Sequence, residues 1–528
     1  MNGPRKFLLI VASILTFSPL MFSSATNIYI TQDGSSKGAC TASPHNAAWF
    51  NSSSNWGGGT SQIGPGTTVL LCGTISSPLT VQGSGTSSAP LTISFDTNAS
   101  ITIPVCPSSG CLNIANQSYV IVDGGTACGW VSQAQVACNG SVQATASGSA
   151  YGNGGTSSFG IEASNCSYCE VRNLQIANIY QHTSSNDTPG GDFRAIDQAG
   201  LTSAGATFKV HNNVLHDSAD GFDYIPGSSG DNGMYYYNNY SYNMGAHGNI
   251  ANNNNGTITG AQIHDNYFGS TANWDSPGCF NHHNSFHVFS YVQTASGIQY
   301  YNNTIGGNWG NCPTSELFFE GSGSLISNVS VFNNVFGATY VQENNGIVSL
   351  TAGGSNLFAN NTVIGAFASG DTCVFLNNNS GGKWTVENNL VNSCYQPFFT
   401  NGSASQFSIM DYNTWGGTSG SPWGVQCGNG CTYYPSLPAW TSGTGLDSHS
   451  NWGNNNTYPA VTSEGILQSG SPAINSAVNL TSLGVVALNM DAAGNPRPAS
   501  GQWTGGAFNY NSAGQPPSAP TGLMATVN

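Results

Sequence analysis

Short apolar or aromatic runs recur along the middle of the chain, and each ends in an asparagine pair or a close variant. The pairs are Asn212-Asn213, Asn238-Asn239, Asp265-Asn266, Asn302-Asn303, Asn333-Asn334, Asn360-Asn361 and Asn388-Asn389, with Asp411-Tyr412-Asn413 as a weaker last copy. From Asn213 onward the second asparagines follow one another at steps of 26, 27, 37, 31, 27, 28 and 24 residues. A period near 27 without helical periodicity indicates one coil of strands and turns per repeat.

The repeated asparagines predict a ladder of side-chain amides. Asparagine tolerates the left-handed backbone conformation and can hydrogen-bond in a tight turn. Stacked in successive coils, the amides can bond to one another, for about 0.5–1.5 kcal/mol each if water is excluded. A series of ordinary hairpins explains neither the steady period nor the single pair per repeat.

A second strand follows most asparagine pairs after ten to sixteen residues. Alternation points four side chains into the coil, those of Phe222, Tyr224, Phe286 and Val288. The same alternation points Asp223 and His287 to the outside.

The asparagine pairs, the run Tyr119–Gly125 and the run Pro65–Leu71 resemble the right-handed parallel β-helix repeat superfamily, which has the pectate-lyase-like fold. The resemblance implies an all-β chain, a single-stranded right-handed parallel β-helix with an N-terminal cap. Residues 470–475 and 491–497 resemble the terminal coil of such proteins. The superfamily includes lyases, hydrolases, epimerases and binding proteins, so the resemblance is specific for fold and not for activity.

The chain divides into four segments. Residues 1–25 predict a signal peptide, with Arg5 and Lys6 before an apolar run and small residues at the cleavage site. The alternative, a membrane anchor, fits less well because polar residues interrupt that run. Residues 26–115 predict the cap and first coils, and residues 116–510 the β-helix. Residues 511–528 predict a Pro/Gly linker with the start of a fibronectin type III-like strand.

Charge and cysteine content narrow the partners and the compartment. Charged residues make up 6% of the chain, and eight Lys plus Arg against 23 Asp plus Glu give a net charge of −15. Nucleic acid and membrane surfaces are therefore unexpected partners. The superfamily resemblance implies instead an extracellular polysaccharide as the partner, and the chain is expected to be a monomer. Fourteen cysteines predict disulfides and secretion. The close pairs are Cys106/Cys111, Cys128/Cys138, Cys166/Cys169 and Cys427/Cys431.

Two clusters carry candidate chemistry. In His216–Asp223, the carboxylates of Asp217, Asp220 and Asp223 could hold Ca²⁺, and Asp220 and Asp223 could serve as acid and base. The alternative is a run of solvated carboxylates in a corner of the coil. The second cluster is His282-His283-Asn284-Ser285-Phe286-His287, in which His283 and His287 are candidate catalytic residues. A metal site or a structural role are the alternatives there.

A strand around Glu320 extends this picture. If the register holds, Asp223, His287 and Glu320 form a catalytic line on the outer face of one sheet. Coils lie ~4.8 Å apart, so residues two coils apart are separated by about 10 Å, enough for a groove holding several sugars. Exposed rings offer flat apolar surfaces to sugar faces. The predicted substrate-binding residues are His216, His247, His282, Trp274 and Trp309.

These observations predict a secreted polysaccharide-degrading enzyme, a glycoside hydrolase or a polysaccharide lyase, acting in a groove on the flank of the β-helix. The catalytic patterns of pectate lyases and polygalacturonases are absent, so no catalytic residue is carried over from them. The alternative is a non-catalytic glycan-binding or cell-surface structural β-helix protein.

Overall fold

The structure is a computed structural model. It describes residues 27–132, 135–145, 157–180, 193–201, 205–227, 233–252, 256–271, 282–310, 313–321, 325–340, 346–365, 372–377, 381–417, 423–427, 430–453 and 459–510. The predicted signal peptide, the linker and the fibronectin-like strand lie outside the described residues. Among the described helices none has the length and apolar character that a membrane crossing requires.

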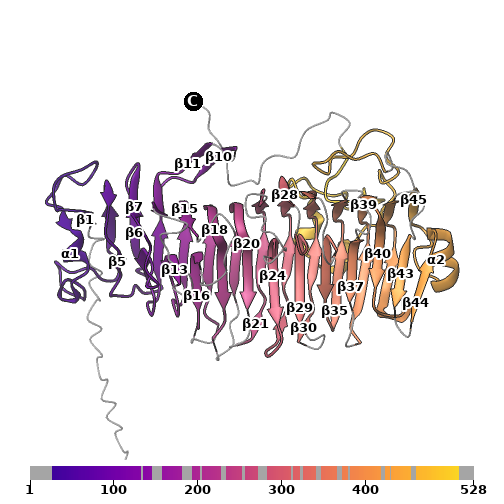
Figure 1. Ribbon diagram of the computed structural model, residues 1–528, viewed down its shortest axis with the longest axis horizontal. Helices are drawn as coiled ribbons and strands as arrows, with labels where there is room; N and C mark the ends of the chain where they lie inside the picture. Colours follow the sequence, from indigo (N-terminus) through magenta and orange to yellow (C-terminus); the bar gives the residue numbers. More distant parts are fainter. Residues whose placement is uncertain are drawn as a thin grey trace, which may run out of the picture.

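Parallel strands stack into a right-handed β-helix, as the sequence predicted (Figure 1). One face of the coils is a 14-stranded sheet, here called the first sheet. Its strands, in spatial order, are β2 (His45–Asn46), β1 (Asn27–Thr31), β3 (Thr68–Leu71), β6 (Leu91–Phe95), β9 (Val120–Asp123), β14 (Cys169–Arg172), β17 (Phe208–His211), β19 (Met234–Tyr237), β22 (Gln262–His264), β26 (Gln299–Tyr301), β31 (Ser330–Phe332), β35 (Ser355–Ala359), β38 (Lys383–Glu387) and β41 (Phe407–Asp411).

The asparagine turns lead from the first sheet into a second stack of parallel strands. In spatial order these are β4 (Thr74–Ile75), β7 (Ala99–Ile103), β12 (Gly140–Ala144), β15 (Leu174–Ile179), β18 (Val214–Ile225), β20 (Tyr240–Asn252), β23 (Tyr267–Phe268), β27 (Thr304–Ile305), β32 (Val335–Phe336), β36 (Thr362–Ile364), β39 (Leu390–Cys394), β42 (Thr414–Gly417) and β45 (Asn451–Gly453).

A third stack closes each coil. It runs through β5 (Leu79–Thr80), β8 (Leu112–Asn113), β13 (Ser158–Glu162), β16 (Phe193–Ala199), β18, β20, β24 (Asn284–Ser290), β29 (Leu317–Gly321), β34 (Val348–Thr351), β37 (Thr372–Asn377), β40 (Gln396–Thr400) and β43 (Gly424–Cys427). An antiparallel strand, β44 (Cys431–Tyr434), ends this stack. The long strands β18 and β20 belong to both the second and the third stack, so they carry the corner between them.

Smaller elements complete the described part of the chain. Short sheets comprise β21 (Ile258–Thr259), β25 (Ala295–Ser296) and β30 (Ile326–Ser327); β28 (Asn308–Gly310) and β33 (Thr339–Tyr340); and the hairpin β10 (Gly129–Ser132) and β11 (Gln135–Ala137). The helices are α1 (Ala47–Phe50) and α2 (Leu437–Thr444), with 3-10 turns η1 (Ser53–Asn55), η4 (Ala404–Gln406), η5 (Thr481–Leu483) and η6 (Val486–Asn489). Figure 1 shows α1 and α2 at opposite ends of the row of coils.

The predicted asparagine ladder is confirmed. The eight amides, those of Asn213, Asn239, Asn266, Asn303, Asn334, Asn361, Asn389 and Asn413, are fully buried. Each side-chain oxygen from Asn239 to Asn413 accepts from the backbone N–H and from Nδ2 of the asparagine one coil earlier, at 2.9–3.2 Å. Asn413 ends the ladder by donating to Asp447 Oδ1 at 3.1 Å.

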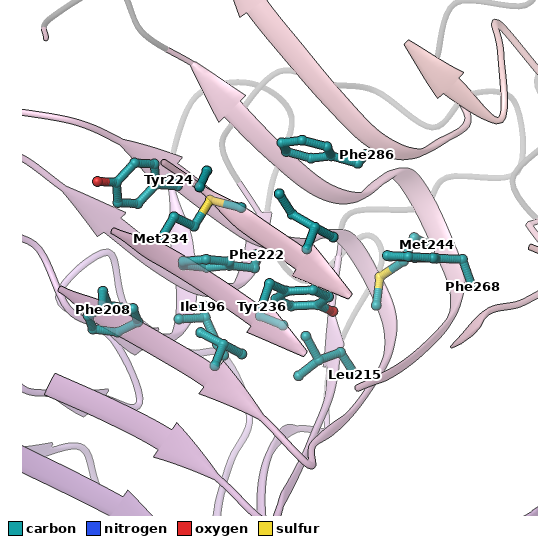
Figure 2. Close-up of a cluster of buried hydrophobic side chains, with 14 of the residues drawn as sticks. Ile196, Phe208, Leu215, Phe222, Tyr224, Met234, Tyr236, Met244, Phe268 and Phe286 are labelled. Carbon is teal, nitrogen blue, oxygen red and sulfur yellow. The ribbon is translucent and has the colours of Figure 1, made fainter. Parts of the chain in front are cut away.

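Apolar side chains fill the space inside the coils in stacked columns. The rings of Phe208, Phe222 and Tyr236 follow one another at centroid distances of 5.8 Å (Figure 2). Phe286 and Val288 are also buried in this core, as the alternation predicted. The core is therefore continuous along the solenoid.

The end of the described chain departs from the sequence expectation of a terminal coil. Residues 459–510, here called the C-terminal strap, return along the outside of earlier coils, where Figure 1 shows them in yellow near β28 and β39. Asn388 donates to the Val478 carbonyl at 2.8 Å and accepts from the Val478 N–H at 3.0 Å. Trp503 and Leu488 cover Phe332.

Six disulfides lie within the described residues: Cys40–Cys72, Cys106–Cys111, Cys128–Cys138, Cys166–Cys169, Cys373–Cys394 and Cys427–Cys431. They include all four close pairs of the sequence.

Candidate functional site

The corner carried by β18 and β20 positions the candidate site. Asp217 and Asn243 both have φ of 52°, and the pairing of the two strands shifts register between Ser218 and Asp220. This bend separates His216, which pairs within the second stack, from Asp220 and Asp223, which pair within the third. The cluster that is continuous in sequence therefore divides into two places.

A hydrogen-bonded chain crosses four neighbouring strands of the third stack, from β18 to β29. His247 Nδ1 lies 2.8 Å from Asp220 Oδ1. His247 Nε2 lies 3.1 Å from His287 Nδ1, and His287 Nε2 lies 3.2 Å from Glu320 Oε2. We call these four residues the histidine relay. It runs from buried imidazoles to Glu320, whose side chain is 27% exposed.

The relay holds one proton more than two neutral imidazoles carry. Ionised carboxylates only accept hydrogen bonds, so His247 Nδ1 and His287 Nε2 must both donate. One of the two facing nitrogens between the rings must donate as well. Burial lowers the pKa of His287 to about 4, although the hydrogen bond that His287 donates to Glu320 acts in the opposite direction and raises it. The hydrogen-bond geometry therefore places the additional proton between the two imidazole rings.

Both terminal carboxylates are stabilised as anions. The hydrogen bond from His287 lowers the pKa of Glu320, with a further bond from Tyr291 Oη at 2.7 Å. For Asp220, burial opposes ionisation, but the charge and hydrogen bond of His247 outweigh it, so its pKa is lowered. The relay can thus move a proton between the buried imidazole pair and the accessible carboxylate of Glu320.

Aromatic rings surround the accessible end of the relay. His282 lies 6.1 Å from Phe318 and 5.5 Å from His287 between centroids. Phe289 lies 4.9 Å from Tyr291, which is 48% exposed. We call His282, Phe289, Tyr291 and Phe318 the ring cluster. Such rings present apolar surface with polar tips, which suits the faces and hydroxyls of sugars.

A second group of charges lies on the preceding coils and was not found from the sequence. Glu162, Asp197 and Asp223 are register partners on β13, β16 and β18. Arg194 binds Asp223 at 2.7 Å and also binds Asp197. Burial, and next the charge of Asp197, raise the pKa of Glu162 to about 7. Asp197 precedes Asp223 by 26 residues, the step that separates Asn213 from Asn239, and this period is the signal that could have found it.

The predicted calcium ligands do not converge. Asp217 is bound to His216 at 2.5 Å and to Asn243, Asp220 to His247, and Asp223 to Arg194. No group of three His, Cys, Asp or Glu side chains among the described residues is arranged to hold a metal ion. The corner at Asp217 is the reason, because it turns that carboxylate into the second stack.

The predicted catalytic line is formed only in part. Asp223 and His287 share one outward row, two strands apart. Glu320 lies a further strand away and two residues along, paired with Phe289. Asp223 and Glu320 are thus three strands apart, at least about 14 Å at ~4.8 Å per strand. This exceeds the ~5–9.5 Å between the two carboxyls of glycosidases, so these two do not flank one bond.

Four further predicted residues have separate outcomes. Trp309, a predicted substrate-binding residue, is 1% exposed, packs in the core and donates to the Gly306 carbonyl at 3.1 Å. His283 is 2% exposed, outside the relay, and burial lowers its pKa to about 4. Trp274 lies outside the described residues. His216 stacks on Tyr242 in the second stack, away from the relay.

Comparisons with known proteins concern the fold. No family model and no curated protein matches the chain. Among solved structures, it is similar to pectate lyase Pel9A (15% identity over 93% of this chain and 98% of that one, TM-score 0.35). It is also similar to XylC in complex with xylose (9%, 92% and 98%, TM-score 0.47). A third is a mannuronic acid specific polysaccharide family 6 lyase from human gut microbiota (13%, 68% and 78%, TM-score 0.34). By its stacked parallel strands, this chain is a right-handed parallel β-helix protein.

Proposed function

We propose that this chain is a secreted enzyme that cleaves a polysaccharide at the ring cluster, with Glu320 as the catalytic acid–base residue. The observation that carries the proposal is the histidine relay, which connects a buried Asp220 and two imidazoles to a carboxylate accessible among aromatic rings. Six disulfides support export to an oxidising compartment.

The relay provides the proton that bond cleavage requires. When His287 passes its Nε2 proton to Glu320, it takes at Nδ1 the proton that lies between the two rings, so charge moves without exposing either ring to solvent. Glu320 then protonates the departing glycosidic oxygen, a general acid step worth about 10²–10⁴-fold in rate. Proton return along the same bonds restores the starting state.

The test is a polysaccharide panel read in two ways. Release of reducing ends reports cleavage of either kind, and ultraviolet absorbance of unsaturated products reports elimination. Glu320→Gln is expected to lower kcat at least 100-fold while glycan retention in affinity gels persists. His247→Gln, at a positioning residue, is expected to change the pH profile of kcat.

A matched control is His449→Ala. His449 is exposed and paired with Asp411 at 2.7 Å in the last coils, remote from the relay. The variant removes a histidine–carboxylate pair of the type that the relay contains. This pair lies outside the proposed site, so activity should be unchanged. Equal losses in the His449 and Glu320 variants would contradict the assignment.

A non-catalytic glycan-binding role is the second candidate, because the ring cluster alone suffices to hold a sugar. It predicts retention on a glycan without product from any polymer of the panel. It also predicts that Phe318→Ala weakens retention whereas Glu320→Gln leaves it intact.

A further inference from the structure

The region around the proposed site has an unusual charge composition. Residues 210–382 contain no lysine and no arginine. This stretch includes every strand that contributes to the relay and to the ring cluster, and all connections between those strands. Histidine is therefore the only side chain there that can carry positive charge.

The nearest arginine in the relay's own stack is already paired with carboxylates. Arg194 lies on β16, one strand before Asp220, and is bound to Asp197 and Asp223. Arg172 lies on the first sheet, bound to Asp123 at 2.8 Å and to Glu170 at 2.6 Å. These contacts leave both guanidinium groups engaged with carboxylates rather than directed to a polymer.

The relay itself is anionic. Two carboxylates and one additional proton on the imidazole pair give it one net negative charge, and its accessible end is Glu320. A uronate residue in the ring cluster would therefore face a like charge without a lysine or arginine to neutralise it. The rings, in contrast, contact the uncharged faces and hydroxyls of a neutral sugar equally well.

We propose, on the basis of the proposed function, that the substrate is an uncharged glycan and that its cleavage is hydrolysis. Elimination needs a carbon-bound hydrogen made acidic by an adjacent carboxylate or carboxyl ester, and a neutral sugar without either group can be cleaved only by hydrolysis. In hydrolysis the glycosidic C1–O bond breaks and Glu320 protonates the departing oxygen. Water forms the new C1–O bond, and the proton that it releases restores the relay.

The experiment compares polymers that differ only in charge. One pair is a neutral β-glucan and its carboxymethyl derivative, and polygalacturonate represents the polyuronates. Xylan, mannan and galactan complete the neutral set, and each assay is run with calcium and with a chelator. We expect cleavage of at least one neutral polymer, no unsaturated product, and at least tenfold slower turnover of its charged counterpart.

The outcomes separate this inference from the proposed function. Equal or faster cleavage of a polyuronate, with or without calcium, or any unsaturated product, overturns the inference and leaves the enzyme assignment standing. If no polymer is cleaved, the enzyme assignment fails, and affinity gels decide the charge question. Retention by a neutral glycan and not by its charged counterpart supports the inference, whereas retention by the charged polymer, or by neither, overturns it.

Discussion

At each corner between the first sheet and the second stack, two neighbouring asparagines have different roles. The first residue of each pair has a left-handed backbone, as at Asn302 with φ of 54°, and turns the chain. The second, as at Asn303, directs its amide into the buried ladder. Asparagine is suited to both positions because its side chain is short and has both a donor and an acceptor.

Replacing Asn303 by alanine should destabilise the protein markedly. Its amide donates to the Ile263 carbonyl at 2.9 Å and to Asn334, and accepts from Asn266 at 3.1 and 2.9 Å. Buried groups left unpaired cost about 1–3 kcal/mol each, so we expect a loss of about 2–4 kcal/mol in thermal unfolding. Asn302→Gly, which keeps the turn and removes one half-buried bond, is the control. A larger loss in the control would contradict the ladder's role.

The buried carboxyl of Glu162 predicts a pH-dependent stability. Its pKa is about 7 in the folded chain against an ordinary 4.5, because burial and Asp197 disfavour the anion. The folded state thus binds more protons than the unfolded state between these values, so stability falls as pH rises from about 4.5 to 7. Glu162→Gln should leave stability unchanged near about pH 4 and raise it by about 1–3 kcal/mol at about pH 8.

Thermal unfolding over this pH range provides the measurement. Glu464→Gln is the control, since Glu464 is exposed and its pKa is lowered by Ser463 and Thr462 rather than raised by burial. A Glu162→Gln gain that is equal at both pH values would show that the charge of this carboxyl is not the cause.

At the scale of the element, β20 joins the core to the relay. His247 lies beside Asp220 in the relay on the outer face, and Asn249 is in register with the inward Phe222 and Phe286. Asn249 is fully buried, and neither of its side-chain polar atoms has a hydrogen-bond partner within the described part of the chain. One strand therefore combines a satisfied polar residue outside with an unsatisfied one inside.

Substituting Asn249 by leucine should stabilise the protein. Leucine has the same branching and the same number of side-chain heavy atoms, and it has no polar group to desolvate, which costs about 1–3 kcal/mol in a protein interior. We expect a rise of this order in unfolding free energy, measured by thermal denaturation. Phe286→Leu, a conservative change at the neighbouring core position, should be destabilising. A destabilised Asn249→Leu variant would indicate that the amide has a partner other than the described residues.

At the scale of the whole molecule, the C-terminal strap binds the solenoid through the outer asparagines of three pairs. Asn333, Asn360 and Asn388 bond to strap backbone, whereas the inner asparagines continue the ladder. Arg497, 5% exposed, ties the strap together by donating to Asn333 Oδ1 at 2.9 Å and to the Gly506 carbonyl at 3.1 Å. The strap thereby covers apolar rows that face outward on these coils.

Arg497→Ala should loosen the strap and spare the coils. The variant removes the bonds to Asn333 and Gly506 and the ring contact with Trp503 at 5.4 Å. We expect faster hydrogen exchange in residues 459–510 and unchanged exchange around Asn303. Lys209→Ala, at an exposed position of β17, is the matched control because it also removes one positive charge. It should change hydrogen exchange in neither region. Equal acceleration along the ladder would show that the strap and the solenoid unfold together.

The sequence by itself determined the solenoid, its period, its ladder, and which side chains of the second strand face inward. These properties are local: a left-handed asparagine fixes a turn, and alternation fixes the face of a strand. The four close cysteine pairs follow from the same proximity along the chain. Asp223, His287 and Glu320 could be placed outside the coil for this reason.

Only the tertiary structure decided which outward residues meet. The relay joins positions from 220 to 320, and its contacts depend on the register shift after Ser218, on coils of unequal length, and on the corner at Asp217. A shift of one residue reverses the face, so small uncertainties at each coil add up over three coils. Trp309 was misplaced because it lies buried on the short strand β28. The strap was misplaced because its partners lie 90 to 157 residues earlier in the chain. The sequence shows which side chains could carry chemistry. Which of them come into contact depends on the length and the register of every coil between them.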